Sequence, residues 1–95
     1  MKLLRVIKSP KPEKKWRAVF ETDTGREKST DFGDSSMEDY TQHGDEERRE
    51  AYRARHRKDL ETGDVTRAGY LSWYLLWTGK NLQQNIEAYK KRFNL

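Results

Sequence analysis

The sequence contains no cysteine among its 95 residues. This absence excludes disulfide bonds, catalysis by a thiolate and zinc sites built from cysteine. It also removes any need for an oxidising compartment, so we expect an intracellular protein. No apolar run approaches the roughly 20 residues of a membrane-spanning helix, so we expect no membrane partner. The apolar stretch before Lys8 and Pro10 is too short for a secretory signal peptide.

Apolar residues are scarce as well: only 33% of the residues are hydrophobic, whereas 38% are charged. The hydrophobic core must therefore be small, and residues 1–95 are too few to divide it between two domains. Aromatic residues make up 12% of the chain, and each large ring buries much apolar surface. These rings argue against a disordered chain and predict a single folded domain.

The net charge of +4 is unevenly distributed along the chain. Residues 1–33 carry nine Lys or Arg against five Asp or Glu, and residues 65–95 carry five against one, so each segment has a net charge of +4. Residues 34–64 carry six against ten, a net charge of −4. Pairing between the segments would neutralise much of this charge, so the basic pI is a weak indication of nucleic-acid binding.

The first third of the chain, residues 1–33, has the pattern of a β-meander. Short apolar or alternating stretches at 3–7 and 16–22 and a polar stretch at 26–32 predict three strands. The turn between the last two contains Gly25, which suits a positive φ. We therefore predict a three-stranded antiparallel sheet with one apolar face.

The remainder predicts a loop over residues 33–45 followed by three helices, at residues 45–58, 66–78 and 82–93. The first is highly charged, and the sequence from residue 59 to 64 is expected to end it. The second is apolar on nearly every side, which indicates burial against the sheet, with Gly79 as its C-terminal cap. The predicted fold class is α+β, with the sheet packed against two helices and the charged helix at the edge.

The charged helix offers the first candidate site. Arg49, Arg53 and Arg57 recur every four residues and share one stripe, and arginine forks suit phosphate groups. Such a nucleic-acid-binding surface would be extended by the basic segment Lys8, Lys11, Lys14, Lys15 and Arg17. If the two ends of the chain meet in space, Lys90, Lys91 and Arg92 would join this patch. The alternative is a solvated helix, held by the pairs Glu50–Arg53 and Glu46–Arg49. The sequence favours DNA and RNA equally.

A second candidate group combines histidines with acids. The predicted polar cluster consists of Asp39, Tyr40, His43, Tyr52 and His56. With Asp45 and Asp59 nearby, metal binding or acid–base catalysis is conceivable, but no spacing typical of a metal or nucleophile site occurs. We therefore expect a structural role for this cluster, no metal and no cofactor. The aromatic residues of the 66–78 helix are likewise expected to pack in the core.

Much of the chain resembles a small family of proteins without an assigned activity, encoded mainly by large double-stranded DNA viruses of algae and protists. The resemblance rests on the words Phe32-Gly33, Asp39-Tyr40-Thr41, His43, Asp45, Arg49, Tyr52, Arg55-His56, Ala68-Gly69, Leu76-Trp77 and Tyr89-Lys90-Lys91-Arg92-Phe93. The sequence departs from the pattern at Gly44, where lysine is expected, and at Val65, where proline is usual. The resemblance implies a viral context and no particular mechanism.

A small basic viral protein would act in the cytoplasm or nucleus of an infected cell, or be packaged in the virion. Three hypotheses follow for its function. The first is a non-enzymatic nucleic-acid-binding protein, whose arginine stripe and lysines would share one face free of acidic partners. The second is a minor component of the virus particle that binds viral structural proteins through an exposed aromatic patch or sheet edge. The third is an enzyme with a pocket around His43, His56 and Asp39.

Overall fold

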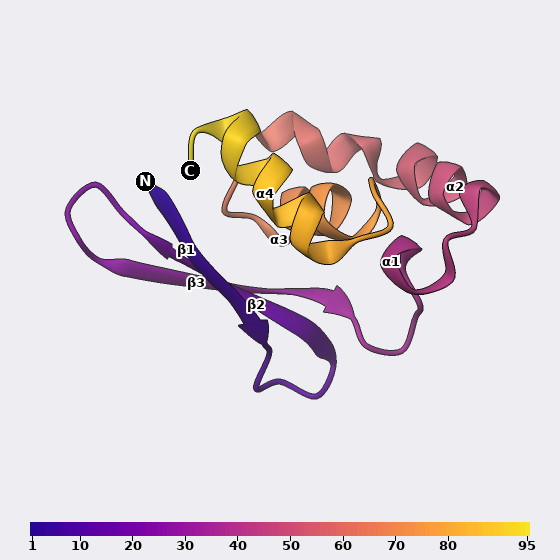
Figure 1. The fold of residues 1–95 in the computed structure, drawn as a ribbon, viewed down its shortest axis with the longest axis horizontal. Coiled ribbons are helices and arrows are strands. Elements are labelled where there is room, and N and C mark those ends of the chain that lie inside the picture. Colours follow the sequence, from indigo (N-terminus) through magenta and orange to yellow (C-terminus); the bar gives the residue numbers. More distant parts are fainter.

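The computed structural model describes residues 1–95 and has the predicted α+β fold, with a layer of helices over a sheet (Figure 1). The sheet is an antiparallel meander of order β1-β2-β3, formed by β1 (Lys2–Lys8), β2 (Lys14–Glu21) and β3 (Glu27–Asp34). Gly25 lies in the β2–β3 turn at φ +82°, as the sequence predicts. The predicted three-stranded sheet is confirmed.

The helical part contains more elements than the sequence predicts. They are α1 (Tyr40–His43), α2 (Glu46–His56), the 3-10 helix η1 (Arg57–Thr62), α3 (Ala68–Leu71), the π-helical turn η2 (Ser72–Leu76) and α4 (Leu82–Phe93). Only α4 coincides with its predicted range, 82–93. None of these helices combines the length and apolar character that a membrane crossing requires.

Helix α1 lies within residues 33–45, which the sequence predicts to be a loop. Asp39 caps it by accepting a hydrogen bond from the Thr41 amide (2.9 Å), and Gln42 accepts one from the Asp39 amide (2.9 Å). This capping box satisfies amides that a single turn would leave free, so a four-residue helix is stable here. The loop prediction was therefore wrong at 40–43.

The predicted end of the 45–58 helix is also wrong, because the chain stays helical beyond residue 59. Asp45 caps α2 through the amides of Glu47 and Arg48, and α2 ends at His56. The chain then tightens into η1, which continues to Thr62 and ends at Gly63 with φ +64°. The expected break thus occurs at Gly63, where a left-handed residue is required.

The predicted 66–78 helix is shorter and irregular, since it is α-helical over α3 and π-helical over η2. Gly79 is not its cap: Gly79 has no positive φ, and the helix ends at Trp77. Gly79 instead allows the side chain of Asn85 to approach, because a Cβ there would lie 2.5 Å from Asn85 Oδ1. Asn85 Nδ2 donates to the carbonyls of Leu75 (2.8 Å) and Gly79 (2.9 Å), which joins α4 to the end of η2.

The core lies between the sheet and α3–η2, with α4 packed on η2. Phe20 and Phe32 point from the sheet into this layer, and Leu71 and Leu75 meet them from the helices, all with 0% exposure. Tyr89 brings α4 to the same core, and its hydroxyl donates to the Val65 carbonyl (2.6 Å). The few apolar side chains therefore gather in one core cluster, which holds the helical layer against the sheet.

Gly33 provides a test of this packing. It lies in β3 at φ +83°, and a Cβ there would lie 3.0 Å from Leu76 Cδ1 and 3.3 Å from Lys15 Cβ. Gly25 has a similar φ of +82° but nothing within 4 Å, so Gly25→Ala is the matched control. Both variants incur the cost of a left-handed alanine. Gly33→Ala should be destabilised by about 1–3 kcal/mol more because of overpacking, measured as the free energy of unfolding in urea. Equal destabilisation would contradict the close packing of β3 on η2.

Candidate functional site

Tyr52 attaches α2 to the rest of the domain through a stack of three rings. Its ring lies parallel to that of Trp77, with centroids 4.3 Å apart and planes 4° apart, and His56 stacks on its other face at 4.1 Å. Burial raises the pKa of Tyr52 to about 12, and the negative charge of Asp59 adds to this rise. The phenol is therefore neutral at physiological pH, and the ring packs between those of Trp77 and His56.

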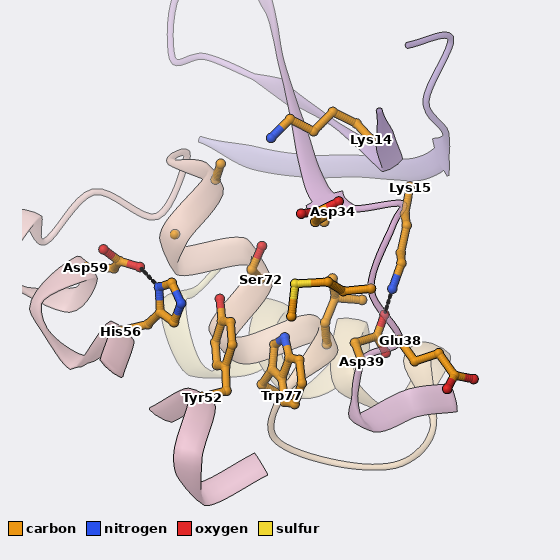
Figure 2. Close-up of a pocket in the computed structure, with 15 residues that line it drawn as sticks. Lys14, Lys15, Asp34, Glu38, Asp39, Tyr52, His56, Asp59, Ser72 and Trp77 are labelled. Atoms are coloured by element: carbon orange, nitrogen blue, oxygen red, sulfur yellow. Dashed lines mark hydrogen bonds and ion pairs between the residues drawn. The ribbon is translucent and has the colours of Figure 1, made fainter. Parts of the chain in front are cut away.

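A cavity of about 250 Å³ lies beside this stack, between the end of the sheet and the helices α2 and α3 (Figure 2). His56 Nδ1 lies 3.2 Å from Asp59 Oδ2 on one wall. On the opposite wall, Lys15 Nζ contacts Asp39 Oδ2 at 2.7 Å. Because a carboxylate can only accept a hydrogen bond, this contact favours an imidazole that carries a proton on Nδ1.

His43 does not line this cavity. Its Nδ1 accepts a hydrogen bond from the Asp45 amide (2.9 Å), its ring lies 5.4 Å from that of Trp77, and its buried Nε2 has no hydrogen-bond partner. Of the predicted polar cluster, His43 and Tyr52 contact Trp77, Tyr40 contacts His43, and His56 stacks on Tyr52. Of the predicted enzyme residues, only Asp39 and His56 line the cavity. No three histidine, aspartate or glutamate side chains converge in a geometry that would hold a metal ion.

Three of the six predicted nucleic-acid-binding residues are engaged within the domain. Arg17 forms a bidentate ion pair with Asp31: Nε donates to Oδ1 at 2.9 Å and Nη2 donates to Oδ2 at 3.0 Å. Lys15 is held by Asp39. Arg49 donates to the Thr78 carbonyl at 2.9 Å, and its guanidinium lies 4.9 Å from the centre of the Tyr40 ring. The expectation of one face free of acidic partners is therefore wrong for Arg17 and Lys15, and also for Arg49, which contacts Glu50.

The predicted pairs Glu50–Arg53 and Glu46–Arg49 do not form. Arg49 contacts Glu50 instead, at 3.2 Å, and Glu46 accepts a hydrogen bond from the Tyr40 hydroxyl at 3.3 Å. Arg53 lies over the face of the Trp73 ring and forms no pair with Glu50. Packing on the domain thus replaces the local helix pairs that the sequence suggests.

Arg53 and Arg57 line one groove of about 500 Å³ between α2–η1 and α4, together with Arg92. The guanidinium carbons of Arg53 and Arg57 lie 4.7 and 5.6 Å from the centre of the Trp73 ring, and that of Arg92 lies 5.3 Å from the Tyr74 ring. None of the three has an ion pair or a side-chain hydrogen bond. We call this site the arginine groove.

From the sequence, Arg92 was considered only with Lys90 and Lys91, as a patch with the basic N-terminal segment, and it was not placed with Arg53 and Arg57. In the run Lys90-Lys91-Arg92 nothing distinguishes it from its neighbours, and all three suit the negative end of the helix dipole. Lys14, by contrast, was predicted but lies on the 250 Å³ cavity, apart from the arginine groove, and forms no ion pair. Tertiary packing, not local pattern, decides which cations meet.

The sequence pattern of a family described as a family of unknown function (DUF5754) matches residues 4–56, more than half of the 95 residues. The chain belongs to this family. The matched range spans the sheet, α1 and α2, and so includes the Tyr52–His56 pair but ends before Arg57. No curated protein and no solved structure matches the chain.

The family's matched segment also contains the Arg17–Asp31 pair, which allows a test of pH dependence. The hydrogen bond from Arg17, with help from Ser9 and nearby positive charge, lowers the pKa of Asp31 from 3.8 to about 2. Ionised Asp31 therefore stabilises the fold above about pH 4, and this contribution disappears as the pH falls through 2.

We expect Asp31→Asn to be less stable than the wild type at pH 7, with the difference shrinking as the pH falls from 4 to 2. The free energy of unfolding, measured with urea across this range, checks the prediction. Glu38→Gln, at an exposed side chain without an ion pair, is the control and should show no such dependence. A difference that stays constant down to pH 2 would contradict the assigned pair.

Proposed function

We propose that the chain is a non-enzymatic nucleic-acid-binding protein, and that the arginine groove contacts phosphate groups. A single observation carries the proposal: three guanidinium groups without acidic partners line one groove and lie over aromatic rings. A contact with a ring face uses the positive charge of a guanidinium but none of its five N–H donors. The donors stay free for phosphate oxygens.

Ring contacts also prepare these side chains for binding. An arginine that already rests on a ring loses less conformational entropy when it pairs with phosphate, so the groove is partly organised in advance. Trp73 is only 2% exposed beneath Arg53 and Arg57, so it offers no open face for a nucleobase. We therefore infer contacts to the phosphate backbone, with little preference for sequence.

Binding of viral structural proteins within a virus particle is the second candidate. It is favoured by β1, an outer strand of the sheet that carries the exposed apolar side chains Leu4 and Ile7. An unpaired strand edge of this kind can accept a strand from another chain. The viral context itself, with action in the infected cell or packaging in the virion, is inferred from the sequence resemblance described above.

The test is a mobility-shift or anisotropy titration with DNA and RNA oligonucleotides at two salt concentrations. Arg57→Gln/Arg92→Gln removes two charges from the arginine groove at exposed side chains. The control, Lys2→Gln/Arg26→Gln, removes two unpaired charges at the start of β1 and in the β2–β3 hairpin, far from α2 (Figure 1). The groove variant should bind more weakly. The slope of the logarithm of affinity against the logarithm of salt concentration should become shallower by about 0.9 for each phosphate that the variant no longer neutralises.

Equal affinities for the two double variants would exclude the arginine groove as the contact surface. No binding of DNA or RNA at low salt would refute the proposed function and favour the β1 edge as the functional surface. Urea unfolding of each variant separates weaker binding from lower stability, because Arg92 also packs against Tyr74.

A further inference from the structure

Helix α2 presents its outer side to solvent along its whole length. None of its residues is buried, and it lies at the end of the helical layer farthest from the β2–β3 hairpin (Figure 1). The exposed positions include Arg48, Ala51, Ala54 and Arg55. Glu47 and Glu50 share this outer face in the first half of α2, so only the second half, with Ala51 and Ala54, has a slim outer face.

The arginines of α2 lie on both sides of these alanines. At roughly 100° per residue, Ala51 and Ala54 are separated by about 60° and mark the centre of the outer face in the second half of α2, whereas Glu47 occupies this angle one turn earlier. Arg48 and Arg55 lie on one flank, where they line a groove of about 450 Å³ with Ala51. Arg53 lies on the other flank, in the arginine groove. Two rows of cations thus border a strip of small side chains.

The flanking arginines are not paired within the protein, although Glu38 lines the same groove as Arg48 and Arg55. Arg48, Arg53 and Arg55 form no ion pair and donate no side-chain hydrogen bond. The acids of α2 all precede Ala51, at Glu46, Glu47 and Glu50, whereas the stretch from residue 51 to 58 contains four cations and no acid. The C-terminal half of α2 and the start of η1 are therefore the part that fits a polyanion.

We propose that this half of α2 enters the major groove of duplex DNA, with its two arginine rows reaching the phosphates on opposite sides. An α-helix with its side chains is about 10–12 Å across, which matches a major groove of about 12 Å. Ala51 and Ala54 allow the helix to approach the base edges closely, and their methyl groups suit thymine methyls. The major groove of duplex RNA is too narrow for this fit.

This inference rests on the proposed function and specifies its ligand. The experiment is an anisotropy titration of the full chain with duplex DNA, duplex RNA and single-stranded DNA of one sequence. We expect duplex DNA to bind at least about tenfold more tightly than duplex RNA. A small minor-groove-binding dye should leave the complex intact.

The decisive variant is Ala54→Glu, which adds a carboxylate at the centre of the outer face without touching the core. It should weaken the affinity for duplex DNA at least about tenfold, because like charges then meet at the contact. Gln84→Glu, at an exposed position on α4, makes the same change in net charge and should have little effect. Circular dichroism of both variants verifies that α2 remains helical.

The outcomes separate the two proposals. Equal binding of all three nucleic acids, or equal effects of Ala54→Glu and Gln84→Glu, would overturn the insertion of α2 while leaving the arginine groove as a phosphate site. Displacement by the minor-groove dye would also overturn it. Absence of binding to any of the three nucleic acids would refute both proposals.

Discussion

The parallel contact between Tyr52 and Trp77 is the interaction on which the arrangement of α2 depends. Helix α2 has no buried residue, so the aliphatic core cannot hold it in place. Tyr52 instead lies flat on Trp77 at 4.3 Å, and Trp77 is 6% exposed and belongs to the core cluster. A ring stack of this kind buries a large area with two stiff side chains, which suits a chain with few apolar residues. The stack fixes the side of α2 that faces the domain and thereby the side that faces solvent.

Once Tyr52 fixes that rotation, the contacts of the arginines follow. Arg49 and Arg53 lie next to Tyr52 on the helix surface and come to rest on the rings of Tyr40 and Trp73. Such contacts shield aromatic surface that the small core leaves uncovered, while the charged ends stay in water. The same arginines therefore contribute to the packing of α2 and to its surface charge. Arg53 can thus pack on Trp73 and keep its donors available, although it forms no pair with Glu50 as the solvated-helix interpretation expected. The hydrogen bond to the Thr78 carbonyl gives Arg49 a structural role.

Local signals in the sequence were sufficient for some elements and not for others. The strands could be predicted from the alternation of apolar and polar residues and from Gly25 in the turn. Helix α4 could be predicted from its N-cap Asn81 and its stripe of apolar residues. Each of these signals acts within a few residues. The π-helical turn was not predictable from local pattern, and its Leu75 carbonyl accepts a hydrogen bond from Asn85 of another helix. The role of Gly79 depends on the same side chain. In the candidate site, the stripe of arginines was visible in the sequence, but the meeting of Arg53 and Arg57 with Arg92 required the packing of α4 against η2.

The charge pattern shows why net charge was a poor guide to this surface. The acidic middle segment, residues 34–64, was expected to neutralise the basic segments on both sides. Only Lys15–Asp39 and Arg67–Asp64 pair across segment boundaries. Asp31 takes its partners from within the first segment, which still keeps unpaired cations such as Lys2 and Arg26. The cations of α4 form no ion pair either. Unpaired cations therefore remain both along the sheet and in the helical layer, where Arg53, Arg57 and Arg92 meet in the arginine groove. A protein of modest net charge can in this way present a strongly basic surface, because the position of its acids matters more than their number.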